Sequence, residues 1–141
     1  MKHLIQYAMS FCGTPYIWGG DDPIKGFDCS GFVQEILASS GIELPKDFTA
    51  DGLYHYLIVN GEGFEGPAQA GALAFFGKAS RITHVGFMLD DYRMIEAGGG
   101  DSRTTDEEVA ARKNAYIRVR SIFLRKDLKA IVRPVYPFDE F

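Results

Sequence analysis

The chain has 141 residues, a length that suits one globular domain with a real hydrophobic core. Apolar residues make up 46% of the sequence, an ordinary value that argues against global disorder. The formal net charge is -4, so we expect no broad basic surface for nucleic acid, although a local basic patch is compatible with this charge. We therefore predict a single domain over residues 1–141 that binds no nucleic acid.

No apolar run in the sequence is long enough to span a membrane. The segment Met1–Ala8 has neither the long apolar stretch nor the small-residue cleavage site of a signal peptide. We expect either synthesis in the cytoplasm of the producing cell or a chain trimmed from a longer one. The two cysteines, Cys12 and Cys29, are too few for a disulfide framework, although they could form one disulfide.

The first half of the chain predicts helices separated by loops. Apolar residues at helical spacing precede Gly13, which marks a helix end, and Asp28 and Thr49 are good N-cap residues. The expected segments are a helix over residues 2–12, a loop rich in aromatic residues, glycine and proline over 14–20, a turn-rich stretch over 21–26, helices over 29–39 and 50–59, and a loop over 61–71.

The second half of the chain changes to the two-residue period of strands. The expected strands cover residues 72–76, 84–89, 93–97, 116–122 and 130–135. Asp90 and Asp91 suit a hairpin turn, and Thr105 followed by Glu108 is typical of a capping box for a helix over residues 106–114. Helices that come first and strands that come later predict an α+β fold, with N-terminal helices packed on an antiparallel β-sheet.

Cys29 is a candidate nucleophile. If Asp28 caps the following helix, Cys29 lies in the first turn, where free amides and the helix dipole stabilise a thiolate. The amides of Cys29 and Ser30 could also stabilise an oxyanion, and the small Ser30 and Gly31 would let a substrate approach closely. Considered alone, however, Cys29 is more typical of a structural packing residue.

A thiol nucleophile needs a base, and the sequence offers His3, His55 and His84. His3 falls in the fraying N-terminal turn, and His55 lies on a helix that suits packing or solvent. His84 begins an apolar strand in which Gly86 keeps space open, so it is well placed to face a cleft. The alternative for His84 is a half-buried strand histidine with no chemical role.

Glu96 is the candidate group that orients His84. It follows His84 by twelve residues across the expected hairpin turn, which puts the two roughly opposite each other, within about one residue of register. The alternative is a strand carboxylate that faces outward, because a slip of one residue would turn Glu96 to the other face. No metal or cofactor site is expected, since no histidine or cysteine pair has ligand spacing and Gly98–Gly100 lacks the context of a phosphate loop.

Three segments carry a more specific pattern. Residues 13–20 are Gly-Thr-Pro-Tyr-Ile-Trp-Gly-Gly, residues 27–33 are Phe-Asp-Cys-Ser-Gly-Phe-Val, and residues 83–86 are Thr-His-Val-Gly. In this order they resemble the NlpC/P60 family of cell-wall peptidases over nearly the whole chain. The resemblance implies a papain-like α+β fold with a cysteine at a helix N-terminus, packed on an antiparallel sheet.

The resemblance also implies roles for single residues. Cys29 corresponds to the nucleophile of the family, His84 to its base, and Glu96 to the polar third residue on the next strand. The third residue of the family is commonly histidine, so Glu96 is a departure; a carboxylate should hold the ring and raise its proton affinity. A second departure is Ala72, where the family usually has aspartate.

The remaining implied roles concern substrate. Tyr16 matches a tyrosine beside the active site of the family, and Asp28 and Ser30 match residues that help to hold the substrate. We also expect Trp18 and the loop Gly98–Gly100 to form walls of the substrate groove, and the amide of Cys29, with help from Tyr16, to stabilise the oxyanion.

The implied reaction is hydrolysis of the bond between γ-D-glutamate and a diamino acid in peptidoglycan stem peptides, without a cofactor. Papain-like acyl transfer, amide cleavage outside the cell wall and a structural role in a phage tail are the alternatives. A bare catalytic domain resembles phage lysins, tail-associated peptidases and injected effectors. A phage tail or secretion machinery is therefore an expected partner, with action on the wall after release, after injection or within a virion.

Overall fold

The structure is a computed structural model that describes residues 1–139, so the last two residues of the expected 1–141 domain lie outside the described residues. In chain order the elements are α1 (Lys2–Met9), β1 (Asp21–Asp22), β2 (Gly26–Phe27), α2 (Cys29–Ser39), α3 (Ala50–Val59), β3 (Gly63–Glu65), β4 (Leu73–Lys78), β5 (Arg81–Met88), β6 (Arg93–Gly98), α4 (Glu107–Lys113), β7 (Tyr116–Ser121), the 3-10 turn η1 (Ile122–Leu124) and β8 (Leu128–Pro134). The expected α+β class is confirmed.

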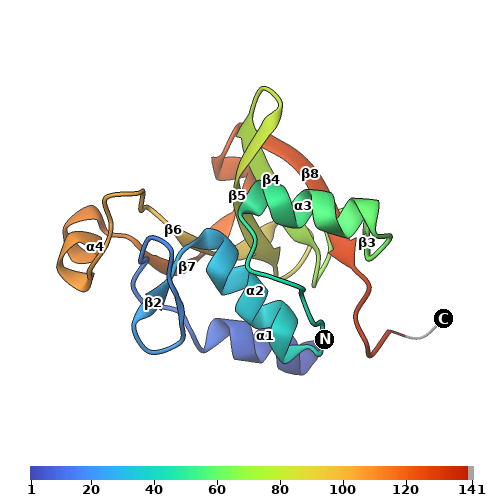
Figure 1. The fold of residues 1–141 in the computed structure, drawn as a ribbon, viewed down its shortest axis with the longest axis horizontal. Helices are drawn as coiled ribbons and strands as arrows, with labels where there is room; N and C mark the ends of the chain where they lie inside the picture. Colours follow the sequence, from blue (N-terminus) through green and yellow to red (C-terminus); the bar gives the residue numbers. More distant parts are fainter. Residues whose placement is uncertain (140–141) are drawn as a thin grey trace.

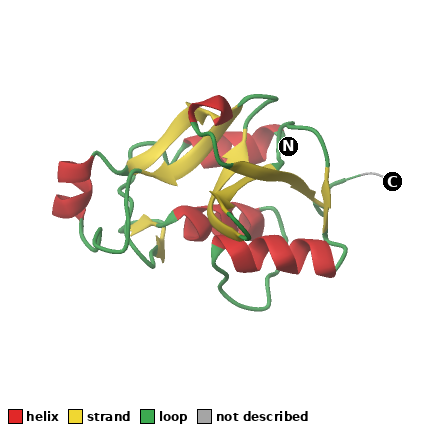
Figure 2. Cartoon of the chain, turned by 90° about the horizontal axis from the view of Figure 1, so that it is seen from above, coloured by secondary structure: helices red, strands yellow, loops and turns green. Residues whose placement is uncertain are grey.

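One six-stranded antiparallel sheet organises the domain, in the order β3-β8-β4-β5-β6-β7, and β1 pairs with β2 in a separate ribbon. Helices α2 and α3 pack against β5, and α1 packs against α2. Figures 1 and 2 show α4 standing apart at one end of the molecule, beyond the helices that cover the sheet. The N-terminal helices therefore pack on the sheet as the sequence predicts.

Local capping explains why α2 and α3 begin where they do. The Asp28 carboxylate accepts a hydrogen bond from the amide of Gly31 at 2.7 Å, and the Thr49 hydroxyl accepts one from the amide of Gly52 at 3.1 Å. Each cap satisfies one of the amides that the first helical turn leaves without a partner. Both helices cover the expected residues, 29–39 and 50–59.

Several expected elements differ from the structure in their bounds or in their type. The first helix ends at Met9, not at residue 12. The capping box at Thr105 is wrong, because Asp106 is the N-cap of α4 and its carboxylate accepts from the amide of Val109 at 2.9 Å. The expected loop over residues 61–71 contains the short strand β3, which pairs with β8. That pairing joins segments far apart in the sequence, so no local pattern predicts it.

The two faces of the sheet bury different clusters, because successive strand residues point to opposite faces. The main core lies under the helices and includes Leu73, Phe75, Val85, Phe87, Ile95 and Ala97. A smaller cluster packs separately and comprises Ala72, Ala74, Phe76, Met88, Met94 and Ile122. Ala72 is fully buried in that cluster, a position that suits an apolar side chain better than the aspartate that the resemblance implies.

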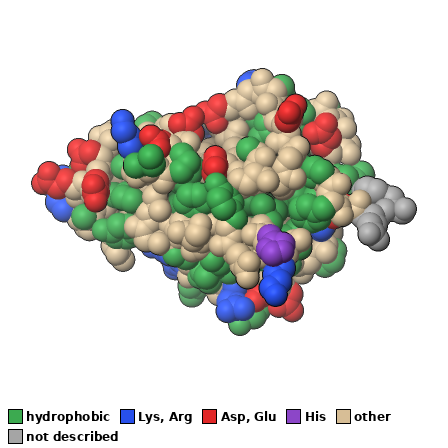
Figure 3. All heavy atoms as spheres, turned by 90° about the horizontal axis from the view of Figure 1, so that it is seen from below, with side chains coloured by type: hydrophobic (Ala, Val, Ile, Leu, Met, Phe, Trp, Pro, Cys, Tyr) green, Lys and Arg blue, Asp and Glu red, His purple; other side chains and the backbone are tan. Residues whose placement is uncertain are grey.

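The outer surface carries charges of both signs. Figure 3 views the molecule from the side on which α1 lies, and shows apolar side chains across the face with acidic and basic side chains around it. No helix among residues 1–139 is long and apolar enough to cross a bilayer.

Candidate active site

Cys29 is the first residue of α2, directly after its N-cap Asp28. Its side chain is half-buried and free, and Cys12 is exposed and also free, so the two form no disulfide. Because Asp28 caps the amide of Gly31, the amides of Cys29 and Ser30 remain in the first turn without a helical acceptor. The thiol therefore lies at the positive end of the helix dipole, beside backbone donors that the helix itself does not use.

Gly31 serves packing and does not open a path for substrate, which corrects the expected role. A Cβ atom at Gly31 would lie 2.1 Å from the carbonyl oxygen of Gly20. The second oxygen of Asp28, Oδ2, accepts a hydrogen bond from the amide of Gly19 at 3.0 Å. The loop before β1 is thus fixed against the start of α2, and this contact holds the position of Cys29.

His84 on β5 and Glu96 on β6 are in contact. Nε2 of His84 lies 3.1 Å from Oε1 of Glu96, and their side chains are only 10% and 3% exposed. The ladder between the strands pairs Phe87 with Ile95. Continuing that register puts Gly86 opposite Glu96, so His84 and Glu96 meet diagonally and the offset is two residues, not one.

The space beside Gly86 is filled, which corrects the expected cleft at that residue. A Cβ atom at Gly86 would lie 2.5 Å from Sδ of Met94 on the neighbouring strand. Gly86 therefore lets Met94 pack closely against β5. Gly86 does not line the cavity next to His84.

The charges around His84 favour its imidazolium form. Burial alone would lower the pKa of His84, but hydrogen bonding to Cys29 and to Glu96 outweighs it and raises the pKa to about 9. Burial also opposes ionisation of Glu96, but the hydrogen bond and charge of His84 hold the pKa of Glu96 below its usual value. Since Glu96 engages Nε2, Nδ1 is the ring nitrogen left for the thiol, and the neutral ring is a base towards Cys29.

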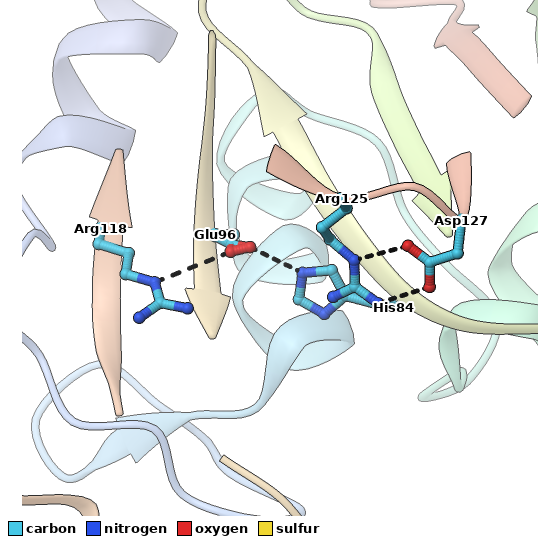
Figure 4. Close-up of polar contacts among 5 residues, drawn as sticks. All are labelled: His84, Glu96, Arg118, Arg125 and Asp127. Atoms are coloured by element: carbon cyan, nitrogen blue, oxygen red, sulfur yellow. Dashed lines mark hydrogen bonds and ion pairs between the residues drawn. The ribbon is translucent and has the colours of Figure 1, made fainter. Parts of the chain in front are cut away.

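Glu96 also faces an arginine. Figure 4 shows Glu96 between His84 and Arg118, whose Nε lies 3.9 Å from Oε2 of Glu96. That distance is too long for a hydrogen bond, and both atoms are buried without a hydrogen-bond partner. The carboxylate of Glu96 is therefore held on one side by its contact with His84. On the other side the positive charge of Arg118 attracts it without a hydrogen bond.

A groove with two arms passes through Cys29. One arm is a cavity of about 250 Å³ that His84, Glu96 and Gly98–Gly100 line together with three arginines; we call it the arginine arm, and its arginines are Arg118, Arg120 and Arg125. The other is a cavity of about 580 Å³ that we call the aspartate arm, and its carboxylates are Asp28, Asp47 and Asp51. Tyr16, Cys29 and Thr83 line both cavities, so the two arms adjoin at these residues.

The remaining predicted residues also line this groove. Tyr16 is buried, and burial, followed by the charges of Cys29 and Asp28, raises its pKa above the usual value, so its hydroxyl stays neutral. Trp18 is 54% exposed and Ser30 is 8% exposed, and both line the aspartate arm. The hydroxyl of Ser30 donates to Oδ1 of Asp28 at 3.4 Å. The catalytic and substrate-binding roles of all these residues stay predictions.

The three arginines of the arginine arm are the residues that sequence reasoning missed. Arg118 and Arg120 alternate along β7, so strand periodicity puts them on the same face, and Glu96 is paired with Arg118 in the ladder. Arg125 follows η1, and no local pattern brings it to His84. Among residues 1–139, no group of three or more histidine, cysteine, aspartate or glutamate side chains is arranged to hold a metal ion.

Comparison with known proteins gives several matches. The chain is 37% identical over 106 residues to the bifunctional muramidase/DL-endopeptidase CwlT of Bacillus subtilis, covering 73% of this chain and 31% of that protein. It is 38% identical over 98 residues to a gamma-D-glutamyl-L-lysine dipeptidyl-peptidase of Bacillus cereus, covering 67% of this chain and 27% of that protein. The chain thus spans less than a third of the length of either relative.

The fold has close structural counterparts. The NlpC/p60 domain of the peptidoglycan hydrolase SagA superposes with a TM-score of 0.64 at 27% identity, covering 92% of this chain and 94% of that chain. The model of the NlpC/P60 family matches residues 13–121, which include Cys29, His84 and Glu96. This chain therefore belongs to the NlpC/P60 family.

Proposed function

We propose that this domain is a cysteine peptidase that hydrolyses the amide bond between γ-D-glutamate and a diamino acid in peptidoglycan stem peptides. The observation that carries the proposal is the meeting of Cys29, at the start of α2, with the buried His84–Glu96 pair in one groove. The names of two relatives support the substrate class, since one is a DL-endopeptidase and the other a gamma-D-glutamyl-L-lysine dipeptidyl-peptidase.

The first half of the reaction forms a thioester. His84 takes the thiol proton at Nδ1, and the Cys29 sulfur attacks the carbonyl carbon of the scissile amide. The negative charge that develops on the carbonyl oxygen is stabilised by the amides at the start of α2. The C–N bond then breaks as the imidazolium of His84 gives its proton to the leaving amine, so the amine departs neutral.

The second half of the reaction releases the acid. Water enters the position that the amine has left, and the neutral ring of His84 takes a proton from it as it attacks the thioester. The C–S bond breaks, and the sulfur leaves as the thiolate that the imidazolium stabilises. Glu96 keeps the ring oriented through both halves, because its Oε1 holds Nε2.

Purified protein and a synthetic tripeptide, L-alanyl-γ-D-glutamyl-L-lysine, test this proposal by mass spectrometry of the products. The expected products are L-alanyl-D-glutamate and free lysine, and Cys29→Ala should release neither. Cys12→Ala is the matched control, since Cys12 is exposed and does not line the groove, and it should keep full activity. Equal product from the Cys29→Ala and wild-type proteins would show that the nucleophile is wrong. Transfer of the acyl group to an added amine in place of water would favour acyl transfer.

A further inference from the structure

The arginine arm carries positive charge, from its three arginines, that has no role in the proposed reaction. Three arginines line this cavity and the single carboxylate among its lining residues, Glu96, is engaged by His84. Figure 4 shows Arg118 and Arg125 on opposite sides of the His84–Glu96 pair. A concave surface with excess positive charge attracts an anionic group of a ligand.

The three arginines differ in how far their charges are already neutralised. Arg125 forms two hydrogen bonds with Asp127, at 2.9 and 2.8 Å, and its guanidinium lies over the ring of Phe76. Arg118 faces Glu96 at 3.9 Å without a hydrogen bond. Arg120 forms no ion pair with any of residues 1–139. Arg120 is therefore the arginine with most of its binding capacity left.

Mutual repulsion supports this view of the cluster. Burial lowers the pKa of Arg118, and the charges of Arg120 and Arg125 act in the same direction against the attraction of Glu96. Like charges that converge on one cavity raise the free energy of the empty site, and a bound anion offsets that cost. A guanidinium group is also well suited to a carboxylate, which it can hold through two parallel hydrogen bonds.

The chemistry of His84 fixes which end of the substrate enters this arm. His84 lines the arginine arm and not the aspartate arm, and in the proposed mechanism it protonates the leaving amine. The leaving group must therefore lie on the arginine side of Cys29. The acyl part then extends into the aspartate arm, which Asp28, Asp47, Asp51 and Arg81 line.

We infer that Arg120, with Arg118 and Arg125, forms a specificity subsite that binds a free carboxylate on the leaving-group side of the scissile amide. This inference rests on the proposed hydrolysis, since the direction of the substrate depends on it. It predicts that the protein discriminates between diamino acids whose α-carboxyl group is free and those in which it is amidated.

The test compares two substrates that differ at one group: the tripeptide L-alanyl-γ-D-glutamyl-L-lysine as the free acid and as its C-terminal carboxamide. We expect wild-type kcat/KM to favour the acid by about tenfold or more, the range of a charged hydrogen bond. Arg120→Gln should bring the ratio close to one, and Arg120→Lys should keep part of it, because the charge remains while the forked geometry is lost.

The ratio isolates the subsite from changes in the catalytic pair. The charge of Arg120 also acts on Glu96, so Arg120→Gln will change turnover of both substrates, but that effect cancels in the ratio. Arg112→Gln, on the exposed face of α4, is the matched control and should leave the wild-type ratio unchanged. A wild-type ratio near one, or a ratio that Arg120→Gln leaves unaltered, overturns the subsite while the proposed hydrolysis stands.

A binding measurement separates the two proposals if no turnover is seen. The affinities of the acid and the carboxamide for the Cys29→Ala protein can be measured by titration calorimetry, with and without Arg120→Gln. Tighter binding of the acid that is lost with Arg120→Gln supports the subsite even if the wild-type protein cleaves neither peptide. Equal affinities, or no binding of either peptide, reject it.

Discussion

Replacing Glu96 by glutamine tests whether the charge of Glu96 stabilises the imidazolium of His84. The side chain keeps its size and an oxygen for the contact with His84, but loses the charge that lies 3.1 Å from Nε2. Both residues are buried, so water screens the pair little. The substitution therefore removes electrostatic support for the imidazolium while it leaves the shape of the site in place.

The size of the effect follows from the pKa of His84. Burial lowers that pKa, but hydrogen bonding to Cys29 and Glu96 outweighs burial and raises the pKa from 6.5 to about 9. At 1.36 kcal/mol per pH unit, the shift corresponds to about 3 kcal/mol in favour of the imidazolium. Because Cys29 and Glu96 share this stabilisation, Glu96→Gln should lower the pKa by about one to two pH units, or about 1.4 to 2.7 kcal/mol.

The pH dependence of kcat/KM measures this shift. The proposed mechanism needs the imidazolium to protonate the leaving amine, so activity falls as pH rises through the pKa of His84. The wild-type protein should lose activity near pH 9. The Glu96→Gln protein should lose it about one to two pH units lower, so its deficit should grow from pH 6 upward and reach roughly 3- to 25-fold at pH 8.5.

The control for this prediction is Glu108→Gln, which removes an equal charge from an exposed residue of α4. It should leave the pH profile where it is in the wild-type protein. If the alkaline limb of Glu96→Gln coincides with that of the wild type, Glu96 does not set the proton affinity of His84, and the electrostatic reasoning is wrong.

Two further predictions concern the start of α2. Gly31→Ala should lower the free energy of unfolding in urea by about 1 to 3 kcal/mol, because its Cβ would meet the backbone oxygen of Gly20 at 2.1 Å. Gly52→Ala, at the equivalent position of α3, is the control and should be nearly neutral, since its closest contacts are side-chain atoms at 3.2 and 3.3 Å; equal losses would refute the packing argument. Asp28→Ala should cost about 1 to 2 kcal/mol, because it removes the cap of α2 and the bond to the Gly19 amide; an unchanged urea midpoint would contradict it.

The elements that the sequence predicted best depend on local contacts. Helix α2 begins after Asp28 and α3 after Thr49, because each cap bonds to an amide only three residues away. A capping residue and its target amide lie in the same short window of sequence, so the pattern is sufficient. At α4 the sequence predicted Thr105 as the cap, whereas the structure uses the next residue, Asp106.

The site residues come together through contacts of longer range, and the sequence predicted some of them but not others. The contact of His84 with Glu96 was expected from one hairpin, although the two residues are offset by two residues in the ladder and not by one. Arg125 could not be predicted in the same way, because it reaches the site from the segment after η1 through its pairing with Asp127. That pair joins residues only two apart, but the place of the segment after η1 depends on the tertiary fold, and no spacing in the sequence indicates which cavity Arg125 will line.

Glu96 and Arg118 are best understood together. A neutral histidine at residue 96, the type common in the family, would leave the buried Nε of Arg118 facing no negative charge, in a cavity that already holds Arg120 and Arg125. The carboxylate supplies that charge and at the same time raises the proton affinity of His84. The ladder pairs Glu96 directly with Arg118, so one cross-strand pair links the proton affinity of His84 to the positive charge of the arginine arm. The glutamate is therefore a residue type that lets an arginine cluster and a histidine of raised proton affinity share one cavity.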